Sequence, residues 1–240
     1  MQTAGQQLSA GLIRARTDAL LGRLRRAALT AGRDPDGFRL VAVTKGFGAP
    51  VVLAAREAGL TAFGENRVQE AAAKVEAVPD VEWHLVGRLQ SNKARAALQL
   101  FGTIHSVDSV ALLERLERIA HDDGRRPALL LQVNVTGDVS KAGFAAAALD
   151  SRLVAALRQL HAARVVGLMT IGPMHAPPDA ARAAFARLRE LRDRLQDALA
   201  RPLPELSMGM SADAEAAVAE GATLVRVGTA IFGPRPAVPA

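Results

Sequence analysis

Residues 40–46 of the chain read LVAVTKG, an apolar run that ends in a single lysine. A short apolar run rich in β-branched residues is typical of a buried strand. Such a run usually closes with a turn residue, but here Lys45 stands between Thr44 and Gly46. Lys45 is therefore either the start of an ordinary loop, with its ammonium group in water, or a functional amine at the tip of a buried strand.

Seven similar runs follow along the chain, and Ala-, Leu- and Arg-rich helical stretches separate them. The predicted strands are RLVAVT (39–44), TAFGE (61–65), EWHLVG (82–87), TIHSV (103–107), ALLLQVNV (128–135), VVGLMTI (165–171), ELSMG (205–209) and TLVRVG (223–228). The predicted helices lie at 50–58, 67–77, 90–99, 109–121, 146–162, 178–200 and 212–220, after a long amphipathic helix at 6–31. Strands that alternate with helices in this way predict parallel βαβ units.

Two α/β folds are built from such units. A doubly wound sheet usually carries the first turn G-x-G-x-x-G, whereas the turn here reads KGFGAP (45–50). A G-x-x-x-x-G-K-[ST] phosphate loop is also absent from the sequence. The eight strands favour a single (β/α)8 TIM-type barrel with an extra N-terminal helix and no second β-domain, although spacing alone leaves the doubly wound sheet open. We expect one domain over residues 1–240, with a short tail at 234–240.

The bulk composition is that of a globular intracellular protein. A chain of 240 residues that is 50% hydrophobic can bury a sizeable core. It has no cysteine, which excludes disulfides and thiolate metal sites and favours a reducing compartment. The N-terminal segment lacks the pattern of a secretory signal, and no apolar run approaches the ~18 residues of a membrane span. We expect a cytoplasmic protein without membrane contact.

The net charge of +6 invites comparison with nucleic-acid-binding proteins. The arginines, however, recur along helical stretches such as RARTDALLGRLRRAAL (14–29), as they do on solvated helix faces. Tyrosine is absent and aromatic residues make up only 3% of the chain, so the stacking platforms of single-strand binders are lacking. We expect no nucleic-acid partner.

The barrel prediction gives Lys45 a location. The chemistry of (β/α)8 barrels lies at the C-terminal ends of the strands, and Lys45 ends the first strand. With a side-chain period of two, Lys45 shares a face with Val41 and Val43. If that face is the barrel interior, the amine enters the mouth partly desolvated, which lowers its pKa and makes it a better nucleophile.

The last two strands end in SMGMS (207–211) and VRVGT (225–229). Barrels often bind a phosphate in the loops after these strands, through backbone N–H groups and hydroxyls. Ser211 is a candidate N-cap of the following helix, and Gly228 with Thr229 forms the next turn. A plain cap and a plain turn are the alternative. Asp213 and Glu215 would repel an anion, so in the phosphate interpretation both must point outward.

Other polar residues lie in or just after the predicted strands. Arg226 alternates with two valines, so it points to the opposite face from them and needs a partner there, either a carboxylate within the barrel or a ligand. Asn66 follows the second strand, and His84 lies in the third, where a lone histidine is more often structural than catalytic. The five histidines show no metal-ligand spacing, so we expect no metal site.

The terminal lysine and the phosphate loops together resemble the barrel-type pyridoxal phosphate (PLP) fold, and more specifically the YggS/PROSC family of PLP homeostasis proteins. The matching motifs are LVAVTK (40–45), FGEN-x-VQE (63–70), WHLVGRLQSNK (83–93), GLMTI (167–171), SMGMS-x-D-x-E-A-A (207–217) and VRVGTAIFG (225–233). They span nearly the whole chain from residue 40. The match at 134–143 is looser, with Asp138 where the family often has Glu, and the GFGAP loop (46–50) departs from the family pattern.

The resemblance implies that Lys45 forms an internal aldimine with PLP. Ser211, Gly228 and Thr229 would hold the phosphate, and Ser207 and Met208 would line that end of the site. The resemblance also places Arg226 beside the pyridine nitrogen, with Asn66 and His84 bordering the cofactor.

Two functions are then open. The first is a PLP carrier that acts in vitamin B6 and amino-acid homeostasis, expected to be a monomer, with PLP-dependent apo-enzymes as candidate partners. The second is an amino-acid racemase of the barrel type. A racemase needs a second base, commonly a tyrosine from a second β-domain, but this sequence contains no tyrosine and ends soon after the last strand. Arg226 would also disfavour protonation of the pyridine nitrogen, which weakens the electron sink. We favour the carrier, and a barrel that uses no PLP is the third alternative.

Overall fold

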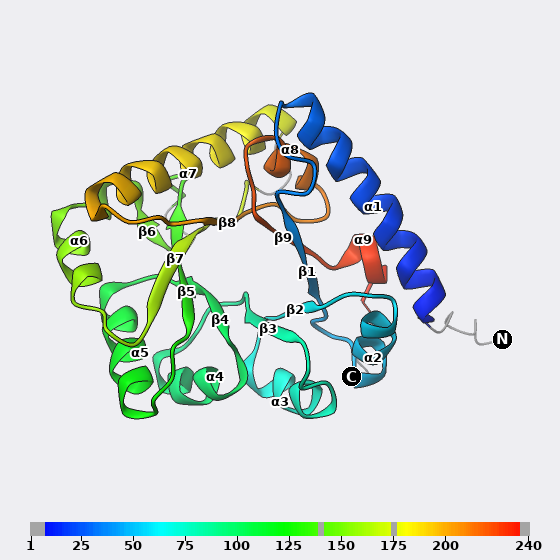
Figure 1. Ribbon diagram of the computed structural model, residues 1–240, viewed down its shortest axis with the longest axis horizontal. Helices are drawn as coiled ribbons and strands as arrows, with labels where there is room; N and C mark the ends of the chain where they lie inside the picture. Colours follow the sequence, from blue (N-terminus) through cyan, green and yellow to red (C-terminus); the bar gives the residue numbers. More distant parts are fainter. Residues whose placement is uncertain (1–7, 139–141, 174–176, 236–240) are drawn as a thin grey trace.

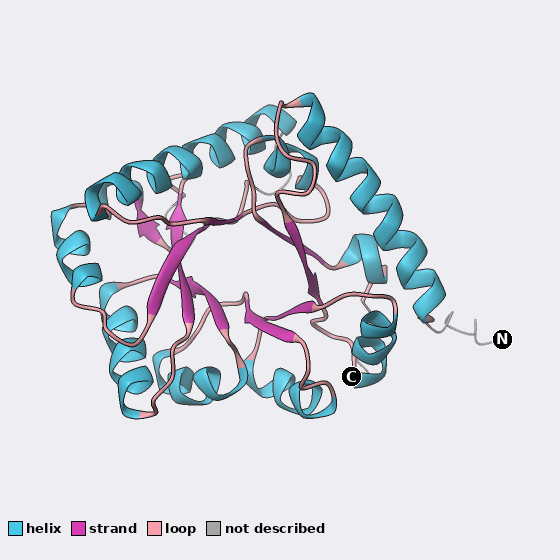
Figure 2. Cartoon of the chain, in the orientation of Figure 1, coloured by secondary structure: helices cyan, strands magenta, loops and turns pink. Residues whose placement is uncertain are grey.

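Eight parallel strands close into a barrel in the computed structural model, which describes residues 8–138, 142–173 and 177–235 (Figures 1 and 2). The barrel strands are β1 (Arg39–Val43), β2 (Ala62–Glu65), β3 (Glu82–Leu85), β4 (Thr103–Val107), β5 (Ala128–Asn134), β7 (Arg164–Met169), β8 (Glu205–Ser207) and β9 (Leu224–Val227). Their order is β4-β3-β2-β1-β9-β8-β7-β5, and pairing of β4 with β5 closes the ring. A doubly wound sheet would leave two open edges, so the closure confirms the barrel prediction.

The helices form an outer ring around the strands (Figure 2). They are α1 (Ala10–Thr30), α2 (Ala49–Glu57), α3 (Val68–Ala77), α4 (Ala94–Leu100), α5 (Val110–Asp122), α6 (Ser151–Arg158), α7 (Pro178–Leu199), α8 (Ala214–Ala219) and α9 (Thr229–Phe232). Short 3-10 turns precede α4 (η1, Ser91–Lys93) and α6 (η2, Ala146–Ala148), and the two-residue strand β6 (Phe144–Ala145) pairs with the end of β5.

Helix boundaries differ from the predicted ones where a side chain caps the helix. Ser9 Oγ accepts a hydrogen bond from the Leu12 N–H, so α1 begins at Ala10, whereas the predicted start at residue 6 lies outside the described residues. Asp150 accepts from the Arg152 and Leu153 N–H groups, which separates α6 from η2 where one helix over 146–162 was predicted.

Side chains of β1 alternate between two cores. Leu40 and Ala42 belong to the large core between the barrel and its helices. Val41 points into the barrel and packs with Leu130, Met169 and Leu224, an apolar layer that fills the interior. Both layers are almost fully buried, and burying each leucine contributes roughly 1.5–3 kcal/mol. The barrel is therefore a packed core, and its open space lies at the strand ends.

Helix α1 supports the two short helices that follow β8 and β9 (Figure 1). Its Arg16 donates to the Ile231 carbonyl at 3.2 Å, and Arg33, just after the helix, donates to the Ala219 carbonyl at 2.7 Å. The extra N-terminal helix thus holds α8 and α9 in place, next to the loops that end the barrel.

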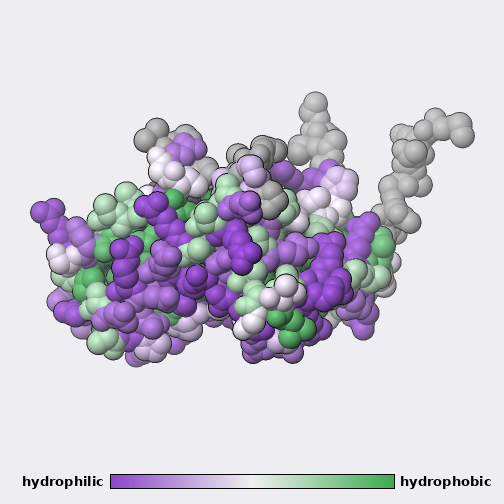
Figure 3. Space-filling model, turned by 90° about the horizontal axis from the view of Figure 1, so that it is seen from above, coloured by the Kyte–Doolittle hydropathy of each residue, from purple (hydrophilic) through white to green (hydrophobic). Residues whose placement is uncertain are grey.

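The outer surface of the molecule is largely hydrophilic in the view of Figure 3, with hydrophobic residues only in small groups. Within the described ranges, no helix is both long and apolar enough to span a lipid bilayer.

Candidate functional site

Lys45 lies at the mouth of the barrel, two residues beyond the last residue of β1. Val41 of the same strand is an interior residue, and Lys45 itself lies in the turn that follows the strand. The side chain is half-buried, and this partial burial, followed by the charge of Arg235, lowers the pKa of Lys45 below its usual value. A lowered pKa leaves more of the amine neutral, so Lys45 has the character of a nucleophile.

The loop after Lys45 connects it to the opposite end of the chain. Gly46 has a φ of 80°, a left-handed conformation that glycine adopts without strain. The Phe47 N–H donates to the Thr44 carbonyl at 3.0 Å, and the Phe47 ring packs on Phe232 of α9 with a centroid distance of 5.5 Å. The GFGAP loop therefore ties the lysine to the helix that follows β9.

A buried ion pair holds the residue before Lys45. Glu65, at the end of β2, and Lys74, on the buried face of α3, approach to 2.6 Å between Oε1 and Nζ. The Thr44 hydroxyl donates to the same Glu65 oxygen at 2.5 Å, and Lys74 donates to the Thr44 carbonyl at 2.9 Å. Both charged side chains are at most 6% exposed. The hydroxyl and the carbonyl of Thr44 are thus both fixed by this pair.

Three loop segments meet beside Lys45, after β8, after β9 and at the end of β1. Ser211 Oγ accepts a hydrogen bond from the Ala230 N–H of α9 at 3.2 Å, so it joins the two final loops. A Cβ on Gly228 would lie 3.0 Å from the Val43 carbonyl oxygen, and one on Gly209 would lie 2.4 Å from the Ala217 Cβ. The contact at Gly209 excludes a side chain there, and the contact at Gly228 leaves little room for one. Thr229 begins α9 directly after Gly228, and Ser211, Gly228 and Thr229 are together called the cup.

Two predictions about the first of these loops were wrong. Ser211 does not cap the next helix, because α8 begins at Ala214 after Asp213 and the Ser211 side chain turns to Ala230 instead. Asp213 does not point outward: its Oδ1 accepts from the Met210 N–H at 2.6 Å, and its Oδ2 lies against Gly172, just after β7. Glu215 does point outward, where it pairs with Arg23 of α1 at 3.0 Å.

Arg226 points into the barrel, and its partners are neutral. It donates to Ser207 Oγ at 2.6 Å and to the Thr170 carbonyl at 2.8 Å. Within the described part of the chain no carboxylate lies at ion-pair distance, and burial lowers the pKa of Arg226 to about 10 although Asp213 acts against this. A buried guanidinium without a carboxylate partner is costly, which favours the ligand alternative over the ion pair.

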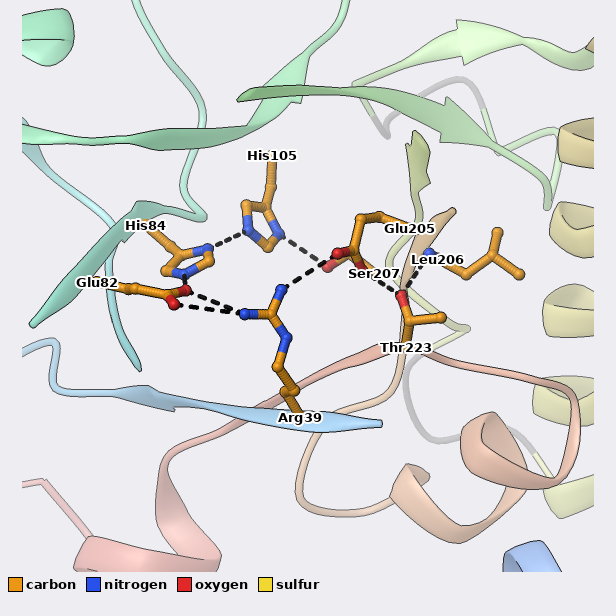
Figure 4. Close-up of polar contacts among 8 residues, drawn as sticks. All are labelled: Arg39, Glu82, His84, His105, Glu205, Leu206, Ser207 and Thr223. Carbon is orange, nitrogen blue, oxygen red and sulfur yellow. Dashed lines mark hydrogen bonds and ion pairs between the residues drawn. The ribbon is translucent and has the colours of Figure 1, made fainter. Parts of the chain in front are cut away.

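Ser207 of β8 continues into a row of polar side chains that includes His105 of β4 and His84 of β3 (Figure 4). Its Oγ lies 2.8 Å from His105 Nδ1, and His105 Nε2 lies 2.9 Å from His84 Nδ1. The structure therefore places His84 away from the mouth: it lines a cavity of about 210 Å³ at the N-terminal end of the strands, next to Arg39 and Glu205.

Asn66 stands between two cavities at the mouth. One, of about 330 Å³, lies over the strand ends near Gln132 and Thr170 and is in the range of ~300–1,000 Å³ of small-molecule sites. The other is an open polar groove of about 1060 Å³ beyond Gly87 and Arg88. Gly87 is required here, because a Cβ would lie 2.3 Å from the Asn66 carbonyl oxygen.

Met208 and Ser207 lie differently from the other predicted site residues. The Met208 side chain belongs to the outer core, so it faces the helices, whereas Ser207 faces the interior and bonds Arg226.

The sequence did not identify three residues of this region, Glu65, Lys74 and His105. One signal for the ion pair was available in the sequence. Lys74 has the spacing of the buried residues of α3, and Glu65 ends the buried strand before that helix.

Comparisons with known proteins agree on one family. The alanine racemase N-terminal domain family matches residues 16–236. A protein of Pseudomonas aeruginosa named pyridoxal phosphate homeostasis protein is 47% identical over 221 residues, which are 89% of this chain and 91% of that protein. One of the same name from Synechocystis is 42% identical over 84% of this chain and 93% of that protein.

The chain belongs to the family of pyridoxal phosphate homeostasis proteins.

Solved structures of the same fold include PipY of Synechococcus elongatus with PLP bound, which has a TM-score of 0.82 and 44% identity and covers 92% of this chain and 100% of that one. The D-threo-3-hydroxyaspartate dehydratase of Delftia has a TM-score of 0.67 and is 24% identical, covering 90% of this chain but 59% of that one, and this likeness shows the fold alone. In this member of the PLP homeostasis family, the described residues contain no group of three or more His, Asp or Glu side chains that could hold a metal ion.

Proposed function

We propose that this protein holds PLP through a covalent bond between Nζ of Lys45 and the aldehyde carbon of the cofactor, and that it serves vitamin B6 and amino-acid homeostasis as a carrier. The observation that carries the proposal is the half-buried amine of lowered pKa at the barrel mouth, beside a glycine-lined cup. In this proposal the whole chain acts as one cofactor-binding domain.

The residues at the mouth fit PLP. The aldehyde needs a primary amine, which Lys45 supplies. The phosphate needs hydrogen-bond donors, and Ser211 and Thr229 offer two hydroxyls beside Gly228. The Asp213 carboxylate, which would repel an anion, accepts from the Met210 N–H and lies against Gly172 after β7. Bound PLP supplies an electrophilic carbon that can exchange between amines.

Arg226 would face the pyridine nitrogen and favour its unprotonated form. A guanidinium has only donors, so the nitrogen that it contacts must act as an acceptor. An unprotonated ring is a weaker electron sink. This supports a protein that retains the cofactor over one that stabilises a carbanion, and Asn66 lies where it can border the ring at the mouth cavity.

We expect Ser211→Ala and Thr229→Ala each to weaken PLP retention about tenfold or more, because each removes a hydrogen bond to a charged acceptor, worth roughly 1.5–3 kcal/mol. Spectroscopic titration with PLP and with pyridoxal measures the effect, and pyridoxal should bind far less tightly than PLP. Ser109→Ala, which removes the hydroxyl that caps α5 away from the cup, is the control. Equal retention of the two vitamers by the wild type would show that the phosphate is bound elsewhere.

A barrel-type racemase is the alternative function, and a solvent-exchange experiment separates the two. We expect L-alanine incubated with the PLP-loaded protein in deuterium oxide to yield neither D-alanine nor rapid α-deuteration, because the sequence has no tyrosine to act as a second base. A slow spectral change on adding amino acids is compatible with the carrier. Racemisation at ~1 s⁻¹, at the low end of typical enzyme rates, would overturn it.

A further inference from the structure

The interior polar chain, defined here as Arg226, Ser207, His105, His84 and Glu82, extends to the cavity at the N-terminal ends of the strands, and Figure 4 shows its members from Ser207 to Glu82. Its four upper members are buried, with exposed fractions of 5% or less, and they come from four different strands. At the lower end, His84 Nε2 lies 3.5 Å from Glu82 Oε2. The hydrogen bonds among the four buried members lie in the barrel interior, as does the apolar cluster of Val41 and Leu130, whereas the Glu82 side chain is 58% exposed.

The donors and acceptors of the upper half can be assigned from chemistry alone. Arg226 can only donate, so Ser207 Oγ accepts from it. The single hydroxyl hydrogen of Ser207 must then find an acceptor, and within the described residues the only other polar atom in hydrogen-bond contact with Oγ is His105 Nδ1. His105 Nδ1 is therefore unprotonated.

The lower half follows from that assignment. Burial, with the charge of Arg226 acting in the same direction, lowers the pKa of His105 well below its usual value, so its ring is neutral with one hydrogen on Nε2. That hydrogen is donated to His84 Nδ1 at 2.9 Å, and the hydrogen of His84 is then on Nε2, facing the carboxylate of Glu82. If the hydrogen bonds ran in the opposite direction, from His84 to His105 to Ser207, the Ser207 hydroxyl would have no acceptor, which is costly in a buried site.

We propose that His105 is a positioning residue for Arg226: it locks the hydroxyl of Ser207 so that its lone pairs face the guanidinium, and His84 and Glu82 hold His105 in the tautomer that this requires. The contact of the positioned Arg226 with the pyridine nitrogen of PLP rests on the proposed function. The histidine tautomers do not depend on it.

The charges around the chain agree with this direction. Asp213 lies on the side of Arg226 and stabilises its positive charge. At the other end, Arg39 bridges Glu82 and Glu205 with N–O distances of 3.1 Å each. The contact with His84, followed by the charge of Arg39, lowers the pKa of Glu82, so an ionised carboxylate faces the donating nitrogen of His84. The interior polar chain thus runs from the cation of Arg226 at the mouth to the anion of Glu82 at the N-terminal end of the strands.

Nitrogen NMR of the full-length protein with labelled histidine, recorded without cofactor, tests the assignment directly. We expect His105 and His84 to be neutral, each with its hydrogen on Nε2, and Ser207→Ala to leave His105 without a single fixed tautomer. A hydrogen on His105 Nδ1, or a doubly protonated ring at His84, would overturn the proposal. Because no PLP is needed, this result stands apart from the proposed function.

Two substitutions at His105 separate positioning from packing. His105→Phe keeps the ring volume but removes the acceptor, and we expect PLP retention to fall about tenfold, the equivalent of one hydrogen bond, with a shifted absorption band of the bound cofactor. His105→Asn restores an acceptor near Nδ1 and should recover most of the loss. His121→Phe, at an exposed histidine of α5, is the control and should change neither quantity.

Thermal unfolding of each variant shows whether the barrel is folded before binding is compared. Folded His105→Phe with wild-type retention and an unshifted band would refute the positioning role. A wild type that does not take up PLP at all would instead refute the proposed function, and the NMR tautomers would still decide whether the interior polar chain is directed as assigned.

Discussion

The Lys45→Ala protein is expected to fold normally and to carry no covalently bound PLP. Lys45 is the amine at the barrel mouth, and the described residues include no hydrogen-bond or ion-pair partner for it, so its removal leaves no buried group unpaired. We therefore expect the free energy of unfolding to change by less than about 1 kcal/mol. Borohydride reduction of the PLP-loaded wild type, followed by peptide mass spectrometry, should locate the cofactor on Lys45, and the visible absorption band should disappear.

A matched lysine controls for non-specific labelling by the aldehyde. Lys93 is also half-buried and lines the open groove beyond Gly87, so Lys93→Ala should retain the full stoichiometric label on Lys45. A wild type that remains colourless in excess PLP, or a label that moves to Lys93 at full stoichiometry, would show that Lys45 is an ordinary loop lysine.

The second large effect is expected at the buried pair of Glu65 and Lys74. Lys74→Met leaves the Glu65 carboxylate buried without its partner, and Glu65→Leu leaves the Lys74 ammonium in the same condition. Breaking a buried pair from one side typically costs about 3–5 kcal/mol, so each single variant should unfold at a clearly lower denaturant concentration. The double variant should recover much of the loss, because no uncompensated charge remains buried.

We also expect the single variants to retain PLP less well, because the pair of Glu65 and Lys74 fixes the carbonyl and hydroxyl of Thr44 directly before Lys45. A double-mutant cycle in denaturant measures the coupling, and PLP titration measures the consequence at the mouth. Glu70→Gln, which breaks the exposed pair with Arg67 on the same helix, is the control and should cost less than about 1 kcal/mol. If Lys74→Met and Glu65→Leu each lowered the free energy of unfolding by less than about 1 kcal/mol, the remaining charge would not be buried and uncompensated.

The fold could be predicted closely because its signals are local. Each barrel strand is a short apolar run, and helices α1 to α8 fall on periodic stretches of the sequence, whereas the four-residue helix α9 was not predicted. Val41 does lie in the barrel interior, whereas the orientation of Lys45, which the period of two along β1 places on the same face, stays a prediction. These features depend on neighbours a few residues apart, so they can be read without knowing where distant segments lie.

The site could be predicted only in part, because its geometry depends on contacts between distant residues. Ser211 seemed a helix cap from its neighbours, but the packing of α9 brings Ala230 within reach of its hydroxyl. Asp213 turns inward because its carboxylate accepts a hydrogen bond from the Met210 N–H and fits against Gly172, which has no side chain. Local sequence patterns carry no information about which loops converge, so such turns are decided by the closed barrel.

The apolar and polar pattern along the chain was thus enough to favour a barrel of parallel strands, with a lysine at its mouth, over a doubly wound sheet. The closure of β4 on β5, the pair between Glu65 and Lys74, and the row of polar contacts from Arg226 to Glu82 were decided only by the tertiary structure. Strand register determines which interior residues share a layer, and it is set by the twist and closure of the whole barrel. His84 and His105 are 21 residues apart, and only that register brings His105 Nε2 within 2.9 Å of His84 Nδ1.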